Sequence, residues 1–245
     1  MTEVSSQLPI IYQDEHIIAI NKPSGLLVHR SMIDRHETRF AMQMVRNMID
    51  QHVYTVHRLD KPTSGVLVFA LSSDVARLMT EQFTEKTIHK TYHALTRGWT
   101  KSQFVDYALK EKLDKIADKD AQQDKAPQEA QTHIACLQRF TYPKAVGRYP
   151  QARLSWVELN PQTGRKHQLR RHLAHVRHPI MGDTTHGDGK QNKFMRDTFN
   201  FHHLALHNSS MKFCHPVTQH PLALSAPLWP ELEHVLATLA PYQSE

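Results

Sequence analysis

The chain has 245 residues, 40% of them hydrophobic, and its formal net charge is +6. Its longest apolar run, residues 66–71, is far shorter than the roughly 18 residues of a membrane span, and its N-terminus is too polar for a signal sequence. The two widely spaced cysteines indicate no disulfide framework, so the sequence predicts a soluble, cytoplasmic protein with a full core and an anionic partner such as nucleic acid.

The first half of the chain predicts strands around one helix. Residues 9–22 alternate like a β-hairpin with its turn at 13–15, and Lys22-Pro23-Ser24-Gly25 forms a further turn. The apolar run 66–71 predicts a buried strand. Ser72 or Ser73 can cap a helix whose apolar positions follow helical spacing, and residues 90–98 alternate as a strand.

The second half begins with a charged, glycine-free segment, residues 105–131, which we interpret as a solvated helical excursion or loop. Residues 165–178 carry five arginines and lysines, four histidines and no acid. Their apolar positions predict a helix that Pro179 stops. The remaining predicted elements are strands at 153–160 and 204–213 and a helix at 231–239.

Strands therefore cluster without strict alternation with helices. This order favours an α+β fold with a mixed, mostly antiparallel central sheet flanked by helices and loops. We find neither an internal repeat nor a linker that forces a division, so we expect residues 1–245 to form a single domain.

One short segment places a lone acid between basic residues and a glycine turn. In "HRLDKPTSGV", residues 57–66, Asp60 precedes Lys61-Pro62, and a turn that leads into the apolar strand is enough to explain it. The alternative is that Asp60 is a nucleophilic or basic carboxylate. The segment alone leaves both interpretations open.

Several familiar sites are missing from the sequence. It has neither the glycine-rich GxGxxG nor the GxxxxGK[ST] loop, no HExxH metal motif and no GxSxG elbow around a nucleophilic serine. The histidines of segment 165–178 are interleaved with arginines, which would repel a divalent cation. We therefore expect no metal and no nucleotide cofactor.

Five ordered motifs resemble those of the RluA-type pseudouridine synthases. They are "YQDEHIIAINKPSG", "HRLDKPTSGVLV", "KTYHALTRG", "TGRKHQLRRHLAHVRHPIMGD" and "LALHNSSMKFCHP", and together they cover most of the chain. The resemblance implies the catalytic fold of that family and the cofactor-free isomerisation of an RNA uridine. The N-terminal RNA-binding domain of some relatives is not expected, because the motifs begin within about twenty residues of Met1.

Further stretches, "VHRSMIDRHE", "LDKIADK" and "GRYP", are similar to members of the family that modify tRNA at uridine 65, in the T-stem. Two departures are minor. His186 stands where relatives often have Tyr, and Asn208 stands where they often have Ala. Both concern details of substrate contact rather than the reaction.

The resemblance also implies roles for individual residues. Asp60 would be the essential carboxylate, Tyr92 would stack on the target base, and Arg58 would enter the space that a flipped uridine leaves. Arg170 would pair with Asp60, because its planar guanidinium suits a carboxylate. The remaining basic residues would contact the phosphate backbone, and they are Arg165, Lys166, Arg171 and Arg177.

The sequence leaves three functions open: a tRNA pseudouridine synthase, a ribosomal RNA pseudouridine synthase of the same family, and a non-catalytic RNA-binding module. It also leaves open whether Asp60 attacks C6 of the base or C1′ of the ribose, or whether a glycal forms. We expect a monomer with no obligate protein partner.

Overall fold

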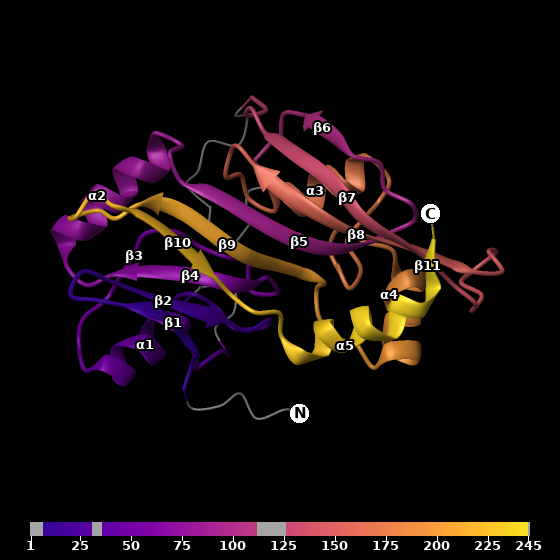
Figure 1. The fold of residues 1–245 in the computed structure, drawn as a ribbon, viewed down its shortest axis with the longest axis horizontal. Helices are drawn as coiled ribbons and strands as arrows, with labels where there is room; N and C mark the ends of the chain where they lie inside the picture. Colours follow the sequence, from indigo (N-terminus) through magenta and orange to yellow (C-terminus); the bar gives the residue numbers. More distant parts are fainter. Residues whose placement is uncertain (1–6, 31–35, 112–125, 245) are drawn as a thin grey trace. The chain divides into compact units, whose positions relative to one another are not determined.

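The computed structural model describes residues 7–30, 36–111 and 126–244, which form two compact units (Figure 1). Unit 1 runs to Lys90 and includes Asn208–Pro227, and unit 2 comprises the other described residues. The single catalytic domain expected from the sequence stays a prediction. Within the described ranges, no helix is long and apolar enough to cross a membrane.

Unit 1 is built on strands in the order β1-β2-β4-β9, with β3 beside β4 and β10 beside β9 (Figure 1). Its strands are β1 (Ile10–Gln13), β2 (Ile17–Lys22), β3 (Tyr54–Thr55), β4 (Ser64–Ala70), β9 (Leu206–Cys214), which begins in unit 2, and β10 (Pro221–Ser225). Its helices are α1 (Ala41–Ile49) and α2 (Ser73–Thr84). Strands β2 and β4 are buried along their whole length, which is why residues 66–71 form an uninterrupted apolar run.

The local signals of unit 1 act as the sequence predicts. The Asp14 carboxylate accepts the backbone N–H groups of His16 and Ile17 in the turn between β1 and β2, each at 2.8 Å. Ser72 caps α2 by accepting the N–H of Val75. Val75 and Met79 then bury one face of that helix in the core of unit 1. The predicted hairpin, buried strand and capped helix are therefore confirmed.

Unit 2 is a second antiparallel arrangement, with strands in the order β5-β8-β7-β11 and β6 beside β7 (Figure 1). Its strands are β5 (His89–Arg97), β6 (Gln103–Asp106), β7 (Gln131–Tyr142), β8 (Ala152–Pro161) and β11 (Gln243–Ser244). Its helices are α3 (Gln168–His175), α4 (Gly189–Phe199), α5 (Pro230–Leu239) and the 3₁₀ helix η1 (Ala240–Tyr242). Apolar residues from all three α-helices pack against β5, β7 and β8. Counted over the described residues, the two α-helices of unit 1, the three of unit 2 and the antiparallel strand pairs agree with the predicted α+β class.

The basic helix is shorter than predicted at both ends. It begins at Gln168, because His167 takes the left-handed conformation (φ 55°). It ends at His175, four residues before Pro179, so the prediction that Pro179 stops it is wrong. The stop is a Schellman motif: Arg177 is left-handed (φ 65°), its N–H bonds the carbonyl of Ala174, and the N–H of His178 bonds that of Leu173.

The charged segment 105–131 is extended where the structure describes it. Val105 is buried within β6, Leu109 pairs with Gln128 in an isolated bridge, and β7 begins at Gln131. For these residues the helical alternative is wrong, because Tyr107 and Leu109 make backbone hydrogen bonds to Ala130 and Gln128 of the opposite segment. The rest of the segment, residues 112–125, lies outside the described residues.

One close approach inside unit 1 requires a glycine. Gly65 opens β4 with a φ of 111°, and a Cβ built on it would lie 2.2 Å from the carbonyl oxygen of Asn208. The Asn208 amide in turn donates to the carbonyl of Val66 at 2.9 Å. The glycine of the "TSG" motif therefore lets β4 and β9 approach closely directly after the Asp60 turn.

We predict that Gly65→Ala lowers the free energy of unfolding by about 3 kcal/mol or more, because the new methyl group meets backbone and the left-handed φ adds strain. Gly189→Ala is the matched control, since no atom lies within 4 Å of its added Cβ and it begins α4. Urea unfolding of both variants measures the difference. Equal midpoints for the two variants would contradict the close approach.

Candidate active site

Asp60 lies in a turn that several backbone bonds hold. Its carbonyl accepts the N–H of Thr63 at 2.9 Å, and the carbonyl of Lys61 accepts the N–H of Gly25 at 2.9 Å. The Ser24 hydroxyl donates to the carbonyl of Pro62 at 2.7 Å. Asp60 itself is partly exposed. The turn therefore holds the Asp60 carboxylate just before β4, tied to the loop that follows β2.

A buried lysine, Lys22, interacts electrostatically with this carboxylate. Sequence reasoning treated it only as part of a turn. Lys22 is fully buried, and its Nζ donates to the carbonyls of Pro23 (2.9 Å), Leu26 (2.7 Å) and Lys61 (3.1 Å). Burial lowers the pKa of Lys22 to about 7, and the Asp60 carboxylate acts in the opposite direction. Lys22 thus fixes both loops around Asp60, and the Asp60 charge favours the protonated form of the Lys22 amine.

His57 and Arg58, which precede the Asp60 turn, have different environments. His57 accepts the N–H of Val68 through Nε2 at 3.0 Å and stacks on Phe83. Burial and then the Lys90 charge lower its pKa to about 3, so it is a neutral acceptor within the fold. Arg58 is exposed, and its charge adds to burial in lowering the pKa of His29. His57 is therefore structural, whereas Arg58 is accessible to a ligand.

Unit 2 carries Tyr92 and Arg170. Tyr92 is partly buried on β5, where it pairs in register with Leu159 of β8 and packs against the core. Arg170 on α3 is 3% exposed, unlike the other arginines of its segment. Its Nε and Nη2 donate to the two oxygens of Asp183, at 2.7 and 2.8 Å.

Asp183, the partner of Arg170, ends the quoted "PIMGD", but sequence reasoning did not single it out. Burial alone would raise its pKa, but the hydrogen bonds from Arg170 and from the N–H of His186 hold the pKa of Asp183 below its usual range. Its backbone carbonyl accepts the Asn192 amide at 2.8 Å. Asp183 therefore orients Arg170 from one side and joins the loop after α3 to α4. The predicted pairing of Arg170 with Asp60 stays a prediction.

The four predicted phosphate contacts all belong to unit 2. Arg165 and Lys166 are exposed in the loop before α3, and Arg165 Nε donates to the carbonyl of Glu129. Arg171 is partly buried and donates to the carbonyl of Lys110 at 2.9 Å. Arg177 is exposed at the end of α3. A guanidinium has five N–H groups, so Arg165, Arg171 and Arg177 keep donors for an anion.

The histidines of the basic segment divide between core and surface. His172 is fully buried, with Nδ1 3.0 Å from the Thr132 hydroxyl and Nε2 3.0 Å from the Tyr107 carbonyl, and burial lowers its pKa. His167 lies 3.0 Å from His186 through ring nitrogens. Among the described residues, no group of three or more acids, histidines or cysteines is arranged to hold a metal ion.

Comparison with known proteins agrees with this arrangement. Residues 16–175 match the family described as RNA pseudouridylate synthase. The chain is 54% identical over 230 residues to a protein of Vibrio parahaemolyticus named tRNA pseudouridine synthase C, covering 92% of this chain and 94% of that one. A Yersinia pestis protein of the same name is 59% identical, covering 89% of this chain and 86% of its own.

Solved structures show the same fold at low sequence identity. Human RNA pseudouridylate synthase domain containing 1 superposes with a TM-score of 0.71 at 23% identity and covers 98% of both chains. Human domain containing 4 gives 0.70 at 24% identity and covers 97% of this chain and 94% of its own. The protein therefore belongs to the RNA pseudouridylate synthase family, of RluA type, and is an isomerase.

We predict that Asp183→Asn lowers the free energy of unfolding by about 3 to 5 kcal/mol, because it leaves the buried Arg170 without its carboxylate. Asp197→Asn is the matched control, since it removes a similar charge from an exposed pair with Lys193. Denaturant unfolding at pH 7 compares the two. A loss for Asp183→Asn no larger than for Asp197→Asn would contradict the role of Asp183.

A second prediction concerns acid. Because the pKa of His57 is lowered in the folded state, its contribution is present above the unfolded pKa of about 6.5 and is lost as the pH falls towards 3. Wild type should lose about 1.4 kcal/mol between pH 7.5 and 5.5 through this group. His57→Gln lacks this group. As the pH falls from 7.5 to 5.5, the free energy of unfolding of the variant, measured in urea, should therefore rise relative to that of wild type by about the same amount. Parallel stability profiles for the two proteins would contradict the prediction.

Proposed function

We propose that the protein is a tRNA pseudouridine synthase that isomerises uridine 65 in the T-stem. The curated relatives at 54 and 59% identity carry the name tRNA pseudouridine synthase C, and this likeness spans about nine tenths of the chain. The observation that carries the proposal is the Asp60 turn, which holds a partly exposed carboxylate and whose backbone is bonded by the buried Lys22. A module that only binds RNA has no use for a fixed carboxylate facing a polyanion.

In this proposal Asp60 is the essential carboxylate. The reaction breaks the bond between N1 of uracil and C1′ of ribose, turns the base and joins C5 to C1′, while C5 loses a proton and N1 gains one. A carboxylate that bonds transiently to the base or the sugar divides this into two easier steps. The backbone of the turn is held by hydrogen bonds before substrate arrives, so the carboxylate needs little reorganisation in the reaction.

Two residues of unit 2 complete the proposed site. Tyr92 would stack on the target uracil and assist removal of the C5 proton. Arg170 would pair with Asp60 and keep it ionised, since a guanidinium near a carboxylate favours the charged form. Its bidentate contact with Asp183 fixes the orientation of the Arg170 guanidinium.

A uridine in a stem must leave the duplex before Asp60 can reach it. Flipping costs a few kcal/mol in lost stacking and pairing. Arg58, exposed two residues before Asp60, would fill the vacated space. The cations Arg165, Lys166, Arg171 and Arg177 would neutralise phosphates, so affinity should fall steeply as salt is raised.

Ribosomal RNA is the second candidate substrate, since sister enzymes of the family share the same motifs. We expect no cofactor, because the proposed chemistry needs a carboxylate, a positioned base and a proton acceptor. We also expect a monomer without an obligate protein partner, since one flipped nucleotide in one stem does not call for two-fold symmetry.

The test is tritium release from RNA labelled at C5 of uridine. We expect wild type to release tritium from tRNA transcripts but not from ribosomal RNA, and Asp60→Asn to release none while binding tRNA with nearly unchanged affinity. Replacing uridine 65 in the transcript should abolish release. Release from ribosomal RNA alone would support the second candidate, and release that survives Asp60→Asn would overturn the proposed role of Asp60.

A further inference from the structure

Unit 2 carries a second group of cations and aromatic rings that the proposed site does not use. It lies at the far end of β5 from Tyr92, where the turn after β5 meets the hairpin between β7 and β8. We call it the basic–aromatic patch, and its residues are Arg97, Trp99, Arg148, Tyr149 and Arg153. Part of it is the stretch "GRYP", residues 147–150, for which the sequence predicted no role.

Two arginines in the patch lie over two exposed rings. The guanidinium carbon of Arg153 is 4.3 Å from the centre of the Trp99 ring, and that of Arg148 is 5.1 Å from the centre of the Tyr149 ring. Trp99 is 36% exposed and Tyr149 is 48% exposed. At that exposure a substantial part of each ring is accessible to a ligand.

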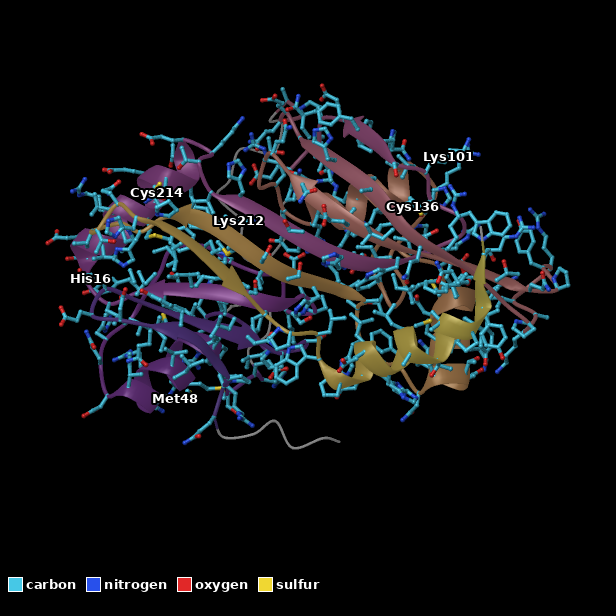
Figure 2. The ribbon with its side chains drawn as sticks, in the orientation of Figure 1. His16, Met48, Lys101, Cys136, Lys212 and Cys214 are labelled. Atoms are coloured by element: carbon cyan, nitrogen blue, oxygen red, sulfur yellow. The ribbon has the colours of Figure 1, made fainter. Side chains whose placement is uncertain are left out.

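The backbone holds these side chains in place. The N–H of Gly98 donates to the carbonyl of Arg153 at 2.7 Å, and Val146 and Tyr149 exchange backbone bonds across the hairpin tip. The indole N–H of Trp99 donates to the carbonyl of Phe140 at 3.3 Å. The turn then continues to Lys101 and to Ser102, which accepts the N–H of Cys136 (Figure 2). The patch is therefore presented by paired strands.

The electrostatics of the patch is dominated by cations. Arg148 donates to the Tyr149 hydroxyl at 3.0 Å. This bond and the charges of Arg148, Arg97 and Arg153 together lower the pKa of Tyr149, so three guanidinium groups act on one hydroxyl. Two acids offset part of this charge: Asp188 pairs with Arg97 at 3.1 Å, and Asp197 interacts with Lys144 beside the hairpin.

Two lysines extend the positive charge beside the hairpin. The side chain of Lys190, at the start of α4, lies close to Gly147, since a Cβ built there would be 3.4 Å from its Cδ. Lys144 Nζ donates to the hydroxyl of Thr198 at 2.8 Å. Exposed rings interleaved with arginines and flanked by lysines match the chemistry of RNA, whose phosphates pair with cations and whose bases stack on aromatic rings.

We propose that the basic–aromatic patch is a second RNA-binding surface, which holds the backbone and an unpaired base of the substrate RNA away from the reacting uridine. Tyr92 and Arg97 are five residues apart on β5, or roughly 16 Å at strand spacing. The patch would thus contact part of the RNA beyond the stem that enters the active site. The inference rests on the proposed function for its substrate class, tRNA.

The experiment measures binding of two RNAs to the catalytically inactive Asp60→Asn protein with and without changes in the patch. One RNA is a full-length unmodified tRNA transcript, and the other is a hairpin that contains only its T arm. The patch variant is Arg148→Ala with Tyr149→Ala. The control is Arg77→Ala, an exposed arginine on α2 in unit 1.

We expect the patch variant to bind full-length tRNA about tenfold more weakly than its parent, with a shallower dependence on salt, because it loses a cation and a stacking ring. Binding of the hairpin should be unchanged, and Arg77→Ala should bind both RNAs like the parent. Tyr149→Phe keeps the ring and should retain most of the affinity. Thermal unfolding midpoints equal to that of the parent exclude a folding defect.

Unchanged tRNA binding in the patch variant would overturn the inference. An equal loss for tRNA and hairpin would also overturn it, because the patch would then belong to the site that holds the T-stem. Failure of the proposed function reads differently: wild type would release no tritium from any RNA, whatever the patch variant binds.

Discussion

A cation that is removed from water must find its partners inside the protein, and this constraint organises both units. Lys22 meets it with three carbonyls from the loops around Asp60. Arg170 meets it with both oxygens of Asp183. In each case the partners come from separate segments of the chain, so pairing the charge also fixes loops that packing of apolar side chains would leave loose.

The sequence predicted what local chemistry decides. The Ser72 cap, the Asp14 turn and the apolar run of β4 depend on neighbours within a few residues, and all three are confirmed. The terminal helix was equally readable, since Leu232, Val235 and Leu239 follow helical spacing and are buried. The five motifs identified the family, and the match over residues 16–175 agrees with them.

What the sequence could not predict depends on distant partners. Helical periodicity predicted that α3 continues to Pro179. The Schellman motif that ends the helix is built on a left-handed arginine, so no glycine in the sequence indicates the stop. The buried state of Arg170 follows from Asp183, thirteen positions later, and a basic run of letters does not reveal it. The sequence did not predict helix α4, which Asp188 caps, because its apolar residues are interspersed with lysines and amides.

The left-handed backbone at Arg177 has a consequence for how this protein can change. A side chain other than glycine or asparagine pays roughly 1 to 2 kcal/mol for that conformation, whatever its charge. A selection for heat resistance alone would therefore drift towards glycine at position 177 and discard an exposed guanidinium beside the basic helix. Keeping arginine there leaves the fold short of its attainable stability by that amount.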